Sequence, residues 1–168
     1  MPNRLGIFEK GGLRLVPILR SGELAEPLHL TEFGQAVIQA TVDNYSDGDD
    51  EPDWPCFAVA LGEQAVGGGG YKTPPVGGEV EIAYFTAPEY EGLGYAGQTA
   101  RLLIARAWRV DPTLTITAET LMDENASVRI LRSIGFEQSE VRVDLDEGVD
   151  VWHWKLRPAA AAGRNLGS

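Results

Sequence analysis

The sequence has a single cysteine, Cys56, and only two histidines, His29 and His153, far apart in the chain. One cysteine cannot close an internal disulfide, so we expect a reducing compartment, the cytoplasm. No cluster of cysteine and histidine suggests a metal site, and we expect no metal. Cys56 lies in the strand-like run PCFAVAL, where a buried, inert thiol is expected. We expect structural or surface roles for the two histidines.

The sequence also lacks long apolar runs and an excess of positive charge. No run approaches the length of a membrane span, and no basic-then-apolar signal follows Met1, so no membrane association is expected. The 14 Lys and Arg residues against 25 Asp and Glu give a formal net charge of -11. Such a field repels nucleic acid and anionic membranes, and it attracts cationic small molecules or basic peptides.

What is present fits one globular domain. The chain has 168 residues, of which 43% are hydrophobic and 23% charged, which is an ordinary composition for a packed core with a charged surface. We predict a single domain over residues 1–157. Residues 158–168, PAAAAGRNLGS, carry nothing to bury, and we expect a disordered tail there.

The hydrophobic pattern alternates between strands and helices. Strands are predicted at 13–19, 79–87 and 113–121, in a hairpin over 57–71, and around EQSEVRVDL and VDVWHWKL. Helices are predicted at 31–45 with a Thr31 cap, at 95–109 with an apolar stripe, and in NASVRILRSIGF up to Gly135. This order predicts an α+β fold with a mostly antiparallel sheet and one strand–helix–strand crossover over 79–121.

A glycine turn leads into the second helix in PEYEGLGYAGQTARLL. Gly92 and Gly94 let the backbone turn tightly and come close to a ligand. The amides of Leu93 to Gly97 should point outward from the helix start, and together with the positive helix end they form an anion site that needs no lysine. A plain glycine-rich turn without a ligand is the alternative.

Three segments in order, VEIAYFTAPEYEGLGYAGQTARLL, AETLMDENASVRILRSIGFEQ and VWHWKL, make roughly residues 57–156 resemble the GNAT superfamily of acyl-CoA-dependent N-acetyltransferases. The Rim-type branch, named for ribosomal-protein acetyltransferases, looks most similar. The resemblance implies the GNAT fold, a mixed central sheet with flanking helices. It also implies an enzyme that moves acetyl from acetyl-CoA to a primary amine, either a small molecule or a protein N-terminus. A non-catalytic acyl-CoA-binding module is the competing interpretation.

The resemblance further implies that the glycine turn cradles the CoA pyrophosphate, and that the strands flanking the helix splay apart to admit the pantetheine arm. The cofactor-binding residues that it implies are Phe85, Ala87, Gly92, Leu93, Gly94, Tyr95, Ala96, Gly97 and Asn125. A backbone N–H near Phe85 is implied to polarise the thioester carbonyl. Asn125 is equally suited to cap the short helix, and Tyr95 to pack on the core. The chain departs from the family's usual Gln or Arg at Glu89, and from its usual A-T-E at residues 96–98.

Glu81 is the first candidate catalytic residue. In EVEIAYF, strand alternation places Val80, Ile82 and Tyr84 on one face and Glu81 with Phe85 on the other. A carboxylate inside a central strand is a candidate general base, and the resemblance implies the same, because Rim-type relatives often carry a glutamate on this strand. A half-exposed strand residue paired with a neighbour is the alternative.

Ser127 is the second candidate catalytic residue. It shares the helical stripe of Ile130, Leu131 and Ile134, which we predict to face inward. The resemblance places this serine beside the thioester sulfur as a proton donor or orienting group. A hydroxyl bonded back to its own helix backbone is the alternative.

Two further segments bear on the acceptor. The run GGGG at 67–70 is poor strand material, which indicates either room for a ligand or a bulge. The acidic run from Asp47 to Asp53 is either a solvated loop or a device that steers a cationic acceptor. A protein N-terminus, an aminoglycoside-like drug and a small polyamine all stay open as acceptors, as do a monomer and a homodimer.

Overall fold

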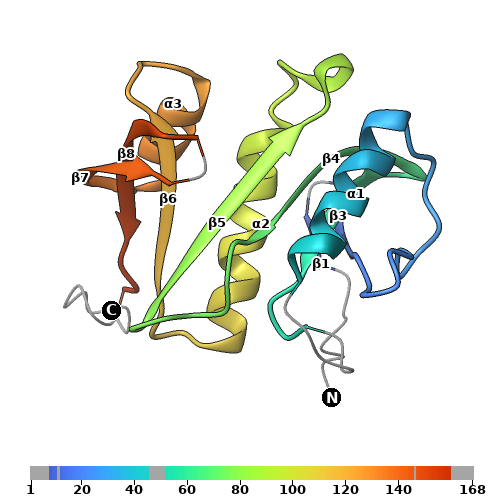
Figure 1. The fold of residues 1–168 in the computed structure, drawn as a ribbon, viewed down its shortest axis with the longest axis horizontal. Helices are drawn as coiled ribbons and strands as arrows, with labels where there is room; N and C mark the ends of the chain where they lie inside the picture. The colour runs from blue at the N-terminus through green and yellow to red at the C-terminus, as the bar shows by residue number, and fades with distance from the viewer. Residues whose placement is uncertain (1–7, 11, 46–51, 146, 160–168) are drawn as a thin grey trace.

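The computed structural model describes residues 8–10, 12–45, 52–145 and 147–159, and Figure 1 shows the course of the chain. Its elements are β1 (Phe8–Lys10), β2 (Leu13–Pro17), α1 (Glu32–Asn44), β3 (Cys56–Leu61), β4 (Gln64–Tyr71), β5 (Glu79–Thr86), the 3-10 turn η1 (Pro88–Tyr90), α2 (Tyr95–Val110), β6 (Thr115–Leu121), α3 (Ala126–Ile134), β7 (Glu137–Asp144) and β8 (Val149–Leu156). Most of the acidic run (residues 47–51) and of the predicted tail (residues 160–168) lies outside the described residues, so the predictions made there stay predictions.

The described strands form one eight-stranded sheet in the order β1-β2-β3-β4-β5-β6-β8-β7. Every neighbouring pair is antiparallel except β5 and β6, which are parallel and are connected through α2. The predicted α+β class, with a mostly antiparallel mixed sheet and one strand–helix–strand unit, is confirmed. Strand β1 was not predicted, because three residues are too few to show a periodicity.

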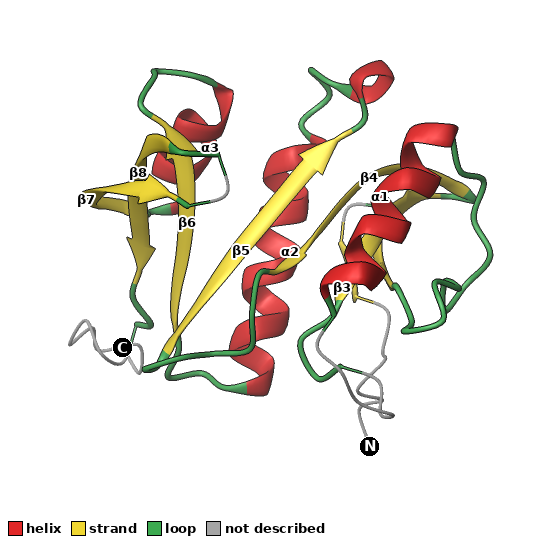
Figure 2. Cartoon of the chain, viewed as in Figure 1, coloured by secondary structure: helices red, strands yellow, loops and turns green. Residues whose placement is uncertain are grey.

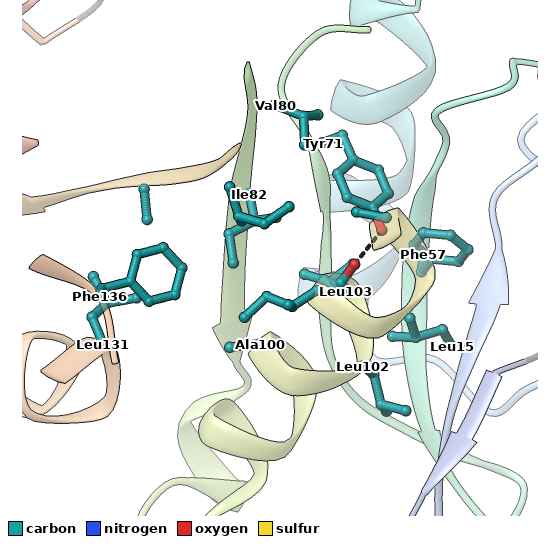
Figure 3. Packing of buried hydrophobic residues seen from close by; sticks show 14 of the residues in the cluster. Leu15, Phe57, Tyr71, Val80, Ile82, Ala100, Leu102, Leu103, Leu131 and Phe136 are labelled. Carbon is teal, nitrogen blue, oxygen red and sulfur yellow. Dashed lines mark hydrogen bonds between the residues drawn. The ribbon is translucent and has the colours of Figure 1, made fainter. Parts of the chain in front are cut away.

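The helices cover opposite faces of the sheet. In Figure 2, α1 lies in front of β3 and β4, whereas α2 and α3 lie behind β5 and β6. Helix α2 carries the predicted apolar stripe, and its Ala100, Leu103 and Ala107 are completely buried. Figure 3 shows Leu103 among core side chains of the sheet, with its carbonyl accepting a 2.6 Å hydrogen bond from the Tyr71 hydroxyl. Burying each large aliphatic side chain stabilises the fold by about 1.5–3 kcal/mol.

Local signals set the helix ends as predicted. Thr31 Oγ1 accepts from the Gly34 N–H at 3.1 Å and begins α1. Asn125 Oδ1 accepts from the Val128 N–H at 3.0 Å and begins α3. Gly135, at φ 114°, ends α3 in the left-handed conformation that favours glycine.

The glycine run is a paired strand whose neighbours come very close. A Cβ on Gly70 would lie 2.6 Å from Cys56 Sγ, and one on Gly68 would lie 2.7 Å from the Phe85 ring. One on Gly67 would overlap the Phe85 carbonyl oxygen. The β3–β4 register shifts between Val59 and Ala60, so the predicted irregularity lies just before the glycines. Glycine is therefore required here by the close approach of β3 and β5.

We expect Gly67→Ala to destabilise the protein by about 1–3 kcal/mol, because the added methyl meets backbone that cannot rotate away. Gly34→Ala is the matched control, since its Cβ has no neighbour closer than 3.5 Å and a helix favours alanine over glycine. Urea unfolding measures both variants. Equal stability of Gly67→Ala and the wild type would contradict the close packing.

Candidate active site

The central strands β5 and β6 pair only at one end. Their parallel register covers Glu79↔Thr115, Val80↔Ile116 and Glu81↔Thr117, yet β5 continues to Thr86 and β6 to Leu121. In Figure 1 the two strands meet at one end and separate toward η1 and α3. The splaying that the resemblance implied is therefore present, and it begins immediately after Glu81.

A cleft of about 700 Å³ lies at the open end, between the end of β5, the turn from Tyr90 to Gly94, the first turn of α2, and α3. We call it the cradle cleft. Its volume falls within the range of roughly 300–1,000 Å³ that is usual for ligand and cofactor pockets.

The first turn of α2 presents unpaired amides to this cleft. Gly94 occupies the N-cap position at φ 82° and offers no side-chain cap. The first backbone bond of the helix runs from the Gln98 N–H to the Gly94 carbonyl at 3.3 Å, which leaves the amides of residues 95–97 without helical partners. Unpaired amides at the positive end of a helix have the chemistry of an anion site, and binding of an anion at this glycine turn stays a prediction.

The structure distributes the predicted cofactor residues unevenly. Lining the cradle cleft are Phe85, Gly92, Gly94, Tyr95, Ala96 and Gly97. Leu93 is 59% exposed, and Ala87 is buried in the wall of a different cavity beneath α1. Asn125 caps α3, as its alternative interpretation held.

A second cavity, of about 240 Å³, lies in the gap between β5 and β6, and we call it the split cavity. It contains both predicted catalytic residues, Glu81 and Ser127. Ser127 and Tyr84 line the cradle cleft as well, so the two spaces meet at these side chains. Residues from distant parts of the chain therefore converge on one site.

The stripe predicted to face inward is confirmed for its apolar members, because Leu131 is buried and Ile130 and Ile134 pack against the core. Ser127, the polar member of the stripe, is exposed, contrary to the prediction. It lies in the first turn of α3, where it lines both the cradle cleft and the split cavity. Among the described residues no hydrogen bond ties its hydroxyl to the α3 backbone, in contrast to Ser133, whose Oγ donates to Ile130.

Glu81 has the strand position predicted for it and also a charged partner. Val80 and Ile82 are buried toward α2, whereas the Phe85 ring packs edge-on against Phe33 of α1, so the face assignment is confirmed. Glu81 Oε2 lies 2.8 Å from Lys72 Nζ. The pairing with a neighbour, the alternative interpretation of Glu81, is thus observed in a residue that also lines the split cavity.

Lys72 bridges two carboxylates. Its Nζ also lies 3.8 Å from Glu119 Oε2 of β6. Burial opposes its charged form, but the close contact and charge of Glu81, followed by the charges of Glu119 and Asp144, outweigh burial and raise the pKa of Lys72. Lys72 is therefore a cation at neutral pH.

His153 lies behind Glu119 and is 1% exposed. Its Nδ1 is 3.8 Å from Glu119 Oε1, and neither ring nitrogen has a hydrogen-bond partner among the described residues. Burial, followed by the charge of Arg142, lowers the pKa of His153, so the imidazole is neutral at physiological pH. His29, by contrast, has a side chain that is 76% exposed.

The backbone of β5 narrows the prediction of a carbonyl-polarising N–H near Phe85 to the neighbouring residues. The Lys72 N–H donates to the Glu81 carbonyl at 3.0 Å, and the Ala87 N–H donates to the Val66 carbonyl at 2.8 Å. Because backbone direction alternates along a strand, the Phe85 N–H also faces β4 and not the gap. The N–H groups that face the gap are those one residue away, at Tyr84 and Thr86.

A third cavity, of about 230 Å³, lies on the α1 face between α1, β3, β4 and β5, and we call it the α1 groove. Val37 and Thr41 of α1 form one wall, and Gly69 and Gly70 form part of the floor. The groove meets the split cavity at Lys72, Ala83 and Tyr84. The glycine run thus combines tight strand pairing with room for a ligand beside it.

Sequence reasoning missed Lys72, Glu119 and Tyr84 as members of the site, and it assigned His153 no part in it. Strand alternation in TITAETL does separate Glu119 from its buried neighbours Ile116 and Ala118, which was an available signal. Tyr84 lines the cradle cleft, the split cavity and the α1 groove, and burial raises its pKa to about 12, so it remains a phenol at neutral pH.

The described residues contain neither a candidate metal site nor a helix able to span a membrane. No group of three or more His, Cys, Asp or Glu side chains within them could hold a metal ion. None of the described helices combines the length and the apolar character needed to cross a membrane.

Solved structures with the same fold are numerous. They include a GNAT-family acetyltransferase from Bacillus anthracis (TM-score 0.64, 15% identity, covering 90% of this chain and 98% of that one). Ribosomal-protein-S5-alanine acetyltransferase from Vibrio fischeri is similar as well (TM-score 0.64, 14% identity, 90% and 96% covered). A putative acetyltransferase from T. thermophilus has a TM-score of 0.66 at 17% identity, with 94% and 92% covered.

At these identities the solved structures establish the fold alone. No curated protein matches the sequence significantly. The family model described as "Acetyltransferase (GNAT) domain" matches residues 23–137, which is more than half of the chain and includes β5, α2 and α3. With the splayed central strands and the open start of α2, this match shows that the chain belongs to the GNAT acetyltransferase family and is an acyltransferase.

Proposed function

We propose that the protein transfers an acetyl group from acetyl-CoA to a primary amine. The observation that carries this proposal is the junction of the cradle cleft and the split cavity at Ser127 and Tyr84. A cofactor held at the start of α2 would therefore reach the cavity that contains Glu81. A carboxylate in that cavity can act as a general base, which favours an enzyme over a module that only binds acyl-CoA.

Backbone groups would make most of the contacts with the cofactor. The amides of Tyr95, Ala96 and Gly97 would hold the pyrophosphate, with Gly92 and Gly94 keeping side chains out of the way. Acetyl-CoA supplies a thioester, whose carbonyl the gap-facing N–H of Tyr84 or Thr86 would polarise. The Ser127 hydroxyl, without an intramolecular partner among the described residues, is free to orient or protonate the leaving thiolate.

The acceptor side uses Glu81 and the α1 groove. An amine must lose its proton before it attacks, and Glu81 would take that proton as general base. The formal charge of -11 favours a cationic acceptor over an anionic one, and it argues against nucleic acid as a partner. Both a small-molecule amine and a protein amine fit. The similarity to an enzyme named for an alanine of ribosomal protein S5 supports the protein amine.

We place the reaction in the cytoplasm because the chain has one cysteine.

Glu81→Gln should lower kcat by about 100-fold or more while changing either KM less, because general-base catalysis typically contributes 10²–10⁴-fold. Glu79→Gln is the matched control. It removes a carboxylate from the same face of the same strand, one paired with Lys155 at 2.8 Å outside the split cavity. Thiol release from acetyl-CoA in a panel of amines measures both variants. An equal loss of kcat in the two variants would exclude Glu81 as the base. If the wild-type protein binds CoA but releases no thiol with any amine, the binding module is favoured instead.

Gly97→Val should weaken CoA binding by about tenfold or more, because its side chain would occupy the cradle cleft beside the free amides. A Cβ at Gly97 meets nothing closer than Ile130 at 3.9 Å, so the fold should persist. Ala105→Val, on an exposed position of the same helix, controls for a β-branched residue in α2. Calorimetric titration with CoA gives the affinities, and unchanged binding in Gly97→Val would overturn the cradle assignment.

A further inference from the structure

In the lining of the split cavity, one lysine lies against two carboxylates. Lys72 follows β4 directly, and its Nζ lies 2.8 Å from Glu81 Oε2 and 3.8 Å from Glu119 Oε2. These carboxylates belong to β5 and β6, on the two sides of the gap. One ammonium group therefore spans the point where the central strands separate.

One buried side chain shows that the site is incompletely satisfied. Glu81 Oε2 is buried, but it has Lys72 Nζ at 2.8 Å as its ion-pair partner. His153, almost completely buried, directs Nδ1 toward Glu119 Oε1 across 3.8 Å without a bond. Buried polar atoms without partners are rare in folded proteins and mark places where a ligand group or water completes the set.

The charge balance of the site favours an additional cation. Glu81, Glu119 and, from the end of β7, Asp144 line the split cavity together with Lys72. The other charged groups that act on this cluster are Arg142 and Glu140 of β7, which face His153 and are ion-paired to each other at 2.6 Å. The two carboxylates that contact Lys72, Glu81 and Glu119, carry more negative charge than one ammonium group balances, so a cation that enters would be attracted.

Lys72 is able to leave its position. Its side chain is 44% exposed, whereas those of Glu81 and Glu119 are 21% and 17% exposed. It lies where the split cavity meets the α1 groove, so its flexible stem has space on either side. The carboxylates, fixed on two strands, stay behind as a formed site.

We propose that Lys72 is a specificity-determining residue that occupies the place of the acceptor's ammonium group, and that a protonated amine binds by displacing it from between Glu81 and Glu119. This inference rests on the proposed function, because it takes the split cavity as the acceptor site. The proposal predicts that the acceptor is a primary amine in its protonated form. The part of the acceptor next to the ammonium group must be narrow enough to occupy the space of the lysine side-chain end. Neutral amines are disfavoured.

The displacement lowers the apparent affinity in a calculable way. A binding site that is available for only a fraction of the time has its dissociation constant raised by the inverse of that fraction. Partly exposed ion pairs are worth little, so Lys72 should reduce the affinity for an amine by about fivefold and not by orders of magnitude.

NMR titration without acetyl-CoA tests the proposal, with n-butylamine as the cationic probe and 1-butanol as an uncharged probe of the same shape. Lys72→Met should bind n-butylamine about fivefold more tightly than wild type, and Lys72→Arg should not. The matched control is Lys155→Met, which removes an equal charge from a 2.8 Å ion pair with Glu79 on the same sheet face outside the cavity. It should leave the affinity unchanged, and 1-butanol should not distinguish any variant.

A second substitution tests whether the amine binds between Glu81 and Glu119. Adding Glu119→Gln to Lys72→Met should reverse the gain, because the incoming ammonium then loses one of its two carboxylates. Unchanged or weaker amine binding in Lys72→Met, or an equal gain in Lys155→Met, would overturn the proposal. Thiol release measured in parallel separates this outcome from failure of the proposed function, since amine binding needs no acetyl-CoA and no turnover.

Discussion

The separation of β5 and β6 after the Glu81–Thr117 pair is the constraint on which the site depends. Parallel neighbours require a crossover, and here the crossover is α2, whose open start lies at the end of β5 where the gap is widest. The same divergence leaves the backbone of Tyr84 and Thr86 without strand partners toward β6. Free amides on the helix and free amides on the strand thus border one space, which is why a single cofactor could engage both.

The divergence also explains the charges at its base. If β5 and β6 paired along their whole length, no cavity would lie between them. Where the two strands separate, Glu81 and Glu119 face the split cavity. Carboxylates so close together repel each other unless a cation lies between them, and Lys72 supplies it. A partly buried ion pair adds little net stability, so its value to the molecule lies in holding a formed cation site.

Sequence reasoning reached the elements and much of the site. Strand alternation placed Glu81 and Phe85 on the correct face, and local capping signals gave Thr31, Asn125 and Gly135 their roles. It failed where the answer depends on pairing between distant strands. The exposure of Ser127 at the two cavities, the register that directs the N–H groups of Tyr84 and Thr86 toward the gap, and the meeting of Lys72 with Glu119 all follow from tertiary packing.

The most direct test of the central claim is amide hydrogen exchange of Tyr84, Thr86 and residues 95–97 with and without CoA. If the cofactor lies between the splayed strands and against the start of α2, CoA should slow exchange at both groups together. The amide of Phe85, which faces β4, should be affected least among residues 84–86. Protection of the helix start alone, or of neither group, would contradict the account, because the gap between β5 and β6 would then not be the cofactor site.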